Sequence, residues 1–125
     1  MKKYYSFQDY QDVPQWYKDI IYKLGWRRIP GFPKPEYYNL NSGRLAYVFH
    51  NKLRERKKGI NKDGYSTTKF KWWDGSFKSL RTNRIALDFV HNPERKPYGH
   101  HKDHDRANNA AANIEPATPK ENANK

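Results

Sequence analysis

The last quarter of the chain, from Tyr98 to Lys125, concentrates the side chains that could do chemistry. Two adjacent histidines, His100 and His101, are followed by Asn113 twelve residues after the pair and by Asn122 nine residues later. A neutral imidazole can accept a proton or bind a metal, and an asparagine amide can bind a metal through its oxygen or hold a loop. Each residue alone has a simpler explanation, as a surface histidine, a turn asparagine or part of a frayed end. Their joint spacing favours a site.

Local patterns predict the elements that would position these side chains. Residues 98–101 can form a strand, residues 102–113 a turn and an asparagine-rich loop, and Ile114-Glu115 a second short strand. Thr118-Pro119-Lys120-Glu121 has the form of a capping box, so we expect a helix to begin there and to carry Asn122. A strand, a loop, a strand and a helix in this order would bring the histidine pair and Asn122 together.

A longer series of motifs surrounds these residues. In chain order they are Arg84-Ile85-Ala86, Phe89, Asn92-Pro93, His100-His101, Asn108-Asn109, Asn113-Ile114 and Thr118-Pro119-Lys120-Glu121-Asn122. Taken together they resemble the HNH endonuclease family, specifically the phage-type HNH and homing endonucleases with a ββα-metal fold. Upstream, residues 26–45 resemble a small module that often precedes such nuclease domains. The resemblance spans residues 26–125.

The resemblance implies a role for each site residue. His101 corresponds to the general base that deprotonates the attacking water. Asn113 corresponds to the middle asparagine, which pins the loop and orients the catalytic histidine. His100 and Asn122 correspond to the protein ligands of one divalent metal ion, Mg²⁺ or Mn²⁺, with Ni²⁺, Co²⁺ and Zn²⁺ as further candidates. Such an ion would stabilise the pentacovalent charge and the 3′-oxygen leaving group.

The chain also departs from the family pattern. His100 stands where aspartate is common, so both protein ligands are neutral, which should favour ions that accept nitrogen over Mg²⁺. Asn83 stands where the family commonly has histidine. Three residues follow Asn122, so we expect a metal-bearing helix of under two turns, no C-terminal DNA-reading module, and lower sequence specificity. His104 and Asp105 fall in the turn, and no catalytic role is expected for them.

The charge of the chain points to a polyanionic partner. The formal net charge is +12, from 25 Lys and Arg against 13 Asp and Glu, and nucleic acid is the polyanion that such a field most often attracts. The basic run within residues 50–62 is explained either as a solvated loop or as a phosphate-contacting segment. The residues expected to contact DNA are Lys52, Arg54, Arg56, Lys57, Lys58, Lys69, Lys71 and Arg84.

Helix signals come before residue 26. Asp12 is expected to cap a helix that starts near Pro14, and Gly25 to end it. Four large apolar residues recur there at helical spacing and predict a packing face: Trp16, Ile20, Ile21 and Leu24.

Strand and turn signals dominate the middle of the chain. Residues 37–40 and 45–49 predict two short strands, joined by an Asn-Ser-Gly turn. Aromatic and β-branched runs on both sides of Asp74-Gly75 predict a hairpin over residues 64–80. Whether its two tryptophans, Trp72 and Trp73, contact DNA or pack in the core is left open. Residues 82–90 predict a short helix that ends before Pro93, because the residue before a proline resists helical dihedral angles.

These patterns predict a small single-domain α+β protein with short strands, a hairpin and a C-terminal ββα-metal motif. We expect three parts: a leader with a short helix (1–25), a nuclease-associated module with a basic loop (26–63) and an HNH nuclease domain (64–125). The chain has no cysteine, which excludes disulfides and cysteine-based zinc sites. It has neither an apolar signal core nor a membrane-length apolar run, so we expect an intracellular protein, in the host cytoplasm if a phage encodes it.

The function expected from these observations is metal-dependent endonucleolytic cleavage of double-stranded DNA, by nicking or by double-strand breaks. The alternative is a DNA-binding protein on an HNH scaffold, with weak or no cleavage. A basic structural subunit of a ribonucleoprotein would explain the charge but not the ordered motifs.

Overall fold

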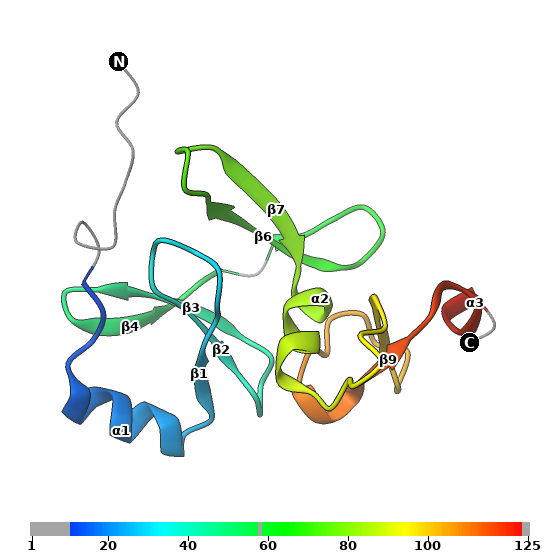
Figure 1. Cartoon of the computed structure of the whole chain (residues 1–125), viewed down its shortest axis with the longest axis horizontal. Helices are drawn as coiled ribbons and strands as arrows, with labels where there is room; N and C mark the ends of the chain where they lie inside the picture. The colour runs from blue at the N-terminus through cyan, green and yellow to red at the C-terminus, as the bar shows by residue number, and fades with distance from the viewer. Residues whose placement is uncertain (1–10, 58, 124–125) are drawn as a thin grey trace.

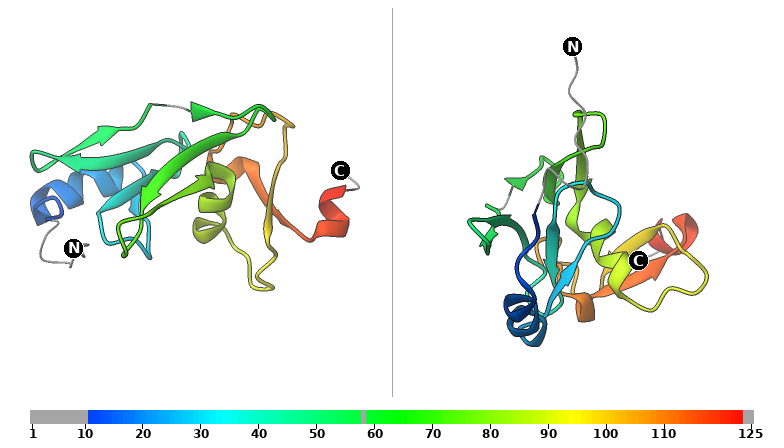
Figure 2. Two further views of the ribbon diagram at one scale, coloured as in Figure 1. Left: turned by 90° about the horizontal axis from the view of Figure 1, so that it is seen from above. Right: turned by 60° about the vertical axis from the view of Figure 1, so that its left-hand side comes forward.

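The computed structural model describes residues 11–57 and 59–123, and it has the α+β fold expected from the sequence. Within these ranges the chain forms three antiparallel sheets and three α-helices (Figure 1). Helix α1 (Gln15–Lys23) and helix α3 (Pro119–Ala123) lie at opposite ends of the molecule in both views in which it lies lengthwise (Figures 1 and 2). None of the helices in the described ranges is long and apolar enough to cross a membrane.

The first sheet is built from strands β1 (Trp26–Arg28), β2 (Glu36–Asn39), β3 (Leu45–Phe49) and β4 (Lys52–Glu55), in that order. The two strands predicted around the Asn-Ser-Gly turn are β2 and β3, and both are confirmed. The prediction of a solvated loop over the basic run was wrong in part, because β4 pairs with β3 along its whole length. The two strands form a hairpin with a two-residue turn, in which His50 and Asn51 have φ of 50° and 63°, and the pairing satisfies the backbone hydrogen bonds of the charged segment.

Helix α1 is confirmed in position but not in its contacts. It ends where Gly25, at φ 99°, follows the last turn. The predicted packing face is confirmed for Ile21, which is buried, and was wrong for Trp16, Ile20 and Leu24, which are 62%, 51% and 60% exposed. Ile21 packs in a small cluster with Val13, Tyr37 and Ala46, so a narrow stripe of the helix makes the contact with the first sheet.

The predicted cap on helix α1 was also wrong. The helix has Pro14 at its N-cap and no side-chain cap. The Asp12 carboxylate instead accepts hydrogen bonds from the Tyr37 hydroxyl and from Arg28 Nη1, both at 2.7 Å. These bonds tie the segment before the helix to the first sheet.

The second sheet contains the predicted hairpin. Strands β6 (Ser66–Lys71) and β7 (Phe77–Arg81) are antiparallel, and the short strand β5 (Gly59–Ile60) pairs with β6 on its other side. The helix predicted over residues 82–90 is present as α2 (Thr82–Ala86), continued by the 3-10 helix η2 (Leu87–Phe89). Val90 is extended, as expected two residues before Asn92-Pro93.

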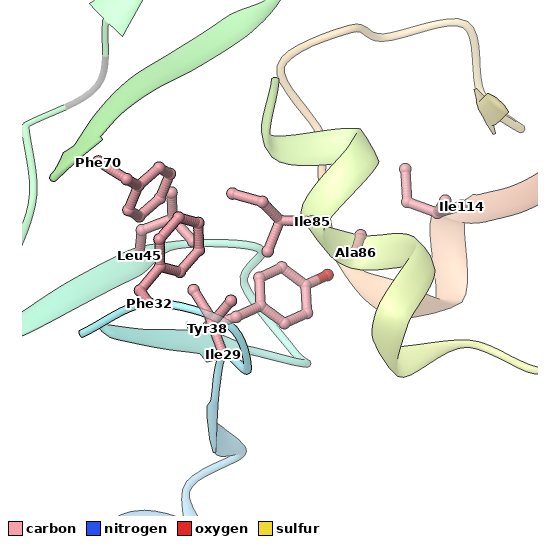
Figure 3. Close-up of a cluster of buried hydrophobic side chains, with 8 residues drawn as sticks. All are labelled: Ile29, Phe32, Tyr38, Leu45, Phe70, Ile85, Ala86 and Ile114. Atoms are coloured by element: carbon pink, nitrogen blue, oxygen red, sulfur yellow. The ribbon is translucent and has the colours of Figure 1, made fainter. Parts of the chain in front are cut away.

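One apolar core joins segments from most of the described chain (Figure 3). Helix α2 sits at its centre, with Ile85 facing the side chains of the first two sheets and Ala86 lying toward Ile114. The buried members are Ile29, Phe32, Tyr38, Leu45, Phe70, Ile85, Ala86 and Ile114. The upstream module and the C-terminal segment therefore share a core. The division into three parts stays a prediction, and residues 1–10 of its leader lie outside the described ranges.

Candidate functional site

The third sheet and the last helix form the ββα arrangement expected from the sequence. Strand β8 (Tyr98–His101) pairs with β9 (Ile114–Ala117), with His101 opposite Ile114, and helix α3 follows directly. The loop between the strands carries the 3-10 helix η3 (Ala111–Asn113). The order strand, loop, strand, helix is thus confirmed.

Helix α2 fixes strand β8 through a close backbone approach. A Cβ atom on Gly99 would lie 2.7 Å from the Asn83 carbonyl oxygen, so this position needs glycine. The Asn83 amide donates a hydrogen bond of 2.9 Å to the Gly99 carbonyl. Asn83, which departs from the family pattern, therefore anchors the strand that carries both histidines.

A polar pocket of about 250 Å³ opens beside β8. His100, His101 and Asn122 all line it, although residues 100 and 122 are far apart in the sequence. Its lining residues are Tyr65, Gly99, His100, His101, His104, Arg106 and Asn122. Asn113 is not part of the lining and lies at the end of η3, within the loop.

His101 is held by a contact that the sequence analysis did not predict. Its side chain is buried, with 5% exposure, and its Nε2 lies 2.9 Å from Oδ1 of Asn109. A carbonyl oxygen can only accept a hydrogen bond, so this contact requires the ring hydrogen on Nε2. Nδ1 then carries a free lone pair and is the basic nitrogen of the ring.

Asn113 and Asp103 brace the loop. The Asn113 amide donates 2.9 Å hydrogen bonds to Oδ1 of Asp103 and to the Asn108 carbonyl, and it accepts one from the Asp103 backbone. Hydrogen bonds from Asn108, from the backbone of Asp105 and from Asn113 lower the pKa of the Asp103 carboxyl to about 2. The carboxylate is therefore ionised throughout the neutral range and organises the turn after β8.

The capping box places Asn122. The Thr118 hydroxyl accepts from the Glu121 backbone at 3.1 Å, and the Glu121 carboxylate accepts from the Thr118 backbone at 3.0 Å. This confirms the predicted capping box. The Thr118 backbone bond, together with the side-chain bonds from Lys96 and Thr118, lowers the pKa of Glu121 to about 2. Asn122 lies on the first turn of the helix that this box starts, with its backbone N–H bonded to the Thr118 carbonyl.

The turn after β2 supports the same loop from the other side. The buried Tyr38 hydroxyl donates to the Asn109 carbonyl, and the Ala111 N–H donates to the Leu40 carbonyl at 2.9 Å. Gly43 has φ 72°, and a Cβ there would come within 2.6 Å of the Ala110 nitrogen. The upstream module therefore holds Asn109, the residue that orients His101.

The comparison with solved structures supports the same fold. The chain matches a structure described as DNA binding and cleavage by the HNH homing endonuclease I-HmuI, with a TM-score of 0.66 and 27% sequence identity. The fold is similar to that of an HNH homing endonuclease. The match covers 79% of this chain and 55% of that chain, so this chain spans about half of that protein's length. No protein-family model matches the sequence. No curated protein matches it either.

The donors in the pocket of this HNH-like fold are neutral. Within residues 11–57 and 59–123, no group of three or more His, Cys, Asp or Glu side chains is placed to hold a metal ion. The potential ligands that line the pocket are imidazoles and the Asn122 amide. This donor set fits a borderline ion whose remaining positions are filled by water or phosphate oxygens.

The expected DNA-contacting residues fall on more than one surface. A groove of about 440 Å³ between the first and second sheets is lined by four of them: Arg54, Arg56, Lys57 and Lys69. Lys52 is exposed on β4, and Lys71 lies on β6. Arg84 lines a different depression, beside Trp72 and Asp88. Lys58 lies outside the described residues.

Arg56 also has a structural role. Its guanidinium donates two hydrogen bonds to the Glu36 carboxylate, one of them 2.6 Å long, and the Glu36 side chain is 3% exposed. Burial raises the pKa of Glu36, and Arg56 opposes that rise. A buried carboxylate needs such a partner, so Arg56 supports the fold whether or not it touches DNA.

Both tryptophans of the hairpin contact protein. Trp72 borders the main core and meets the Phe32 ring edge-on at 5.9 Å, and Trp73 donates to the Gly31 carbonyl at 3.2 Å. These contacts favour the core interpretation for Trp72, whereas Trp73 is half-buried and lies outside the main core.

Two further pocket residues were missed by the sequence analysis. Tyr65 lies 6.1 Å from His101, ring centre to ring centre, and Arg106 stacks on Tyr65 with its guanidinium 4.8 Å from the ring centre. Tyr65 belongs to the hairpin segment and Arg106 to the loop, so no local pattern pairs them. Asn109, in contrast, belongs to the Asn108-Asn109 motif of the family resemblance, although its contact with His101 was not predicted.

Proposed function

We propose that this protein is a metal-dependent endonuclease that hydrolyses phosphodiester bonds in double-stranded DNA. The observation that carries the proposal is the Asn109-bound His101, which shares one pocket with His100 and Asn122. Its support is the likeness to the fold of an HNH homing endonuclease whose structure concerns DNA binding and cleavage. The net charge of +12 suits a DNA substrate.

His101 is the general base of the proposed reaction. With its hydrogen held on Nε2 by Asn109, the ring takes a proton from a water molecule through Nδ1. The resulting hydroxide oxygen forms a bond to phosphorus, and the bond from phosphorus to the 3′-oxygen breaks. The 3′-oxygen leaves with the electron pair and takes a proton from solvent. The products are a 5′-phosphate and a 3′-hydroxyl.

The remaining residues position the reacting groups. Asn113 and Asp103 keep the loop in the shape that presents His101. Arg106, stacked on Tyr65, places a positive charge at the pocket, where it suits a phosphate.

His100 and Asn122 would hold the metal. A divalent ion bound there would stabilise the negative charge that develops on the phosphate and on the leaving oxygen. Two neutral ligands lower the affinity for Mg²⁺ relative to Mn²⁺, Co²⁺, Ni²⁺ or Zn²⁺, because Mg²⁺ prefers carboxylate oxygens.

The DNA path follows the basic groove between the first and second sheets. Arg54, Lys57 and Lys69 line it, and exposed cations at such a groove bind backbone phosphates without reading sequence. Binding should therefore weaken steeply with salt.

A second candidate function is DNA binding with weak or no cleavage. The absence of a three-membered His, Cys, Asp or Glu cluster among the described residues favours it, because a weakly held metal would limit catalysis.

Cleavage of supercoiled plasmid separates the two. We expect nicked or linear product with at least one of Mg²⁺, Mn²⁺, Co²⁺, Ni²⁺ and Zn²⁺, none with EDTA, and none from His101→Ala. His91→Ala is the matched control, since His91 is exposed and does not line the pocket. Intact plasmid in every metal, with DNA still shifted in a gel, would support the binding-only alternative.

A further inference from the structure

His104 lies beside His100 in the pocket. The two rings are 5.3 Å apart, centre to centre, with an angle of 74° between their planes. Both residues line the pocket together with Asn122. No catalytic role was expected for His104 from the sequence, because it lies in the turn that follows β8.

The backbone at His104 adopts a conformation that favours glycine. Its φ is 63°, which is strained for a residue with a Cβ. The turn is closed by a 2.9 Å hydrogen bond from the His104 N–H to the His101 carbonyl, and it is braced by the Asp105 N–H on the Asp103 carboxylate. This arrangement holds the imidazole next to His100 at the expense of local strain.

The separation of the rings agrees with shared metal coordination. A metal–nitrogen distance of about 2.0–2.1 Å puts each imidazole centre about 3.2 Å from the ion. Two such rings at a tetrahedral angle have centres about 5.2 Å apart, whereas rings at a right angle are about 4.5 Å apart. The observed 5.3 Å matches the tetrahedral arrangement. Edge-to-face packing without a metal spans the same range, so a binding measurement must separate the two.

We propose that His104 is a third protein ligand, so that His100, His104 and Asn122 together bind one transition-metal ion in the pocket. This inference rests on the metal site of the proposed function and adds a residue to it. Two imidazoles and one amide form a neutral, nitrogen-rich set that selects Zn²⁺, Co²⁺ or Ni²⁺ over Mg²⁺. A fourth position stays open for water or a DNA phosphate, as in catalytic zinc sites.

The test is Co²⁺ binding by the DNA-free protein, measured by calorimetry and by the visible absorption of the bound ion. His104→Gly is the decisive variant, because glycine suits the backbone conformation and the protein should stay folded. We expect it to lower Co²⁺ affinity by on the order of 100-fold and to remove the strong absorption of a four-coordinate ion. His91→Ala should bind Co²⁺ like the unmodified protein.

Unchanged Co²⁺ affinity in His104→Gly, with affinity lost in His100→Ala, would overturn the proposal and leave the ring contact as packing only. Absence of Co²⁺ binding by the unmodified protein would also overturn it. The proposed function and this inference can fail separately. If the protein cleaves plasmid in a metal-dependent way and His104→Gly binds Co²⁺ as tightly as the unmodified protein, the nuclease proposal stands and the third ligand is refuted. If Co²⁺ binding depends on His104 but no metal supports cleavage, the third ligand stands and the nuclease proposal is refuted.

Discussion

Replacing Tyr38 with phenylalanine tests how the upstream module supports the catalytic loop. The ring stays in the core, stacked on Phe89 at 5.1 Å, but the hydroxyl that donates to the Asn109 carbonyl is lost. Tyr38 is fully buried, so the carbonyl is left unpaired, which costs about 1–3 kcal/mol of unfolding free energy. With a urea m-value of about 1.5 kcal/mol/M, the midpoint should fall by roughly 1 M.

The same substitution should slow cleavage, because Asn109 also orients the His101 ring. Loss of such outer support typically lowers activity by about 10- to 100-fold. Tyr37→Phe is the matched control: it loses a hydrogen bond to Asp12, on the side of the sheet away from the pocket. It should lower stability to a similar extent and leave the cleavage rate unchanged. An unchanged urea midpoint in Tyr38→Phe, or equal loss of cleavage in both variants, would refute the reasoning.

Three further predictions concern the cap, the buried ion pair and the braced turn. Thr118→Ala removes the cap of helix α3, so thermal melts should show a loss of about 1 kcal/mol and Co²⁺ titration a weaker site at Asn122. Arg56→Ala leaves Glu36 buried without its partner and should cost about 3 kcal/mol in urea unfolding, whereas Lys57→Ala should weaken DNA binding without that loss. The Asp103 carboxyl has a lowered pKa of about 2, so the ionised carboxylate contributes its full stabilisation of the folded protein above pH of about 4. That contribution is lost as the pH falls toward 2, and thermal melts of Asp103→Asn should lack this part of the acid dependence.

Elements with strong local signals were predictable from sequence. Strand β8, the Asp74-Gly75 hairpin and the Thr118 capping box each depend on residues within a few positions of one another. Their chemistry is set by turn preference and capping, which act locally. The placement of the histidine pair and Asn122 around one pocket followed from the order of those elements.

Contacts between distant segments were not predictable in the same way. The spacing of Trp16, Ile20 and Leu24 is helical, but it does not tell how much of the helix a neighbouring sheet will cover. The bond between His101 and Asn109 and the approach of His104 to His100 depend on how the loop folds back, which the residue types alone do not specify.

The most direct test of the account is the single-turnover cleavage rate of an end-labelled DNA duplex by the unmodified protein and by His101→Ala, in the metal that supports plasmid cleavage. Gel shifts and circular dichroism on the same samples report DNA affinity and folding. The account predicts 5′-phosphate and 3′-hydroxyl ends, a rate lower by about 10²- to 10⁴-fold in His101→Ala, and equal affinity. A folded His101→Ala variant that cleaves as fast as the unmodified protein would contradict it.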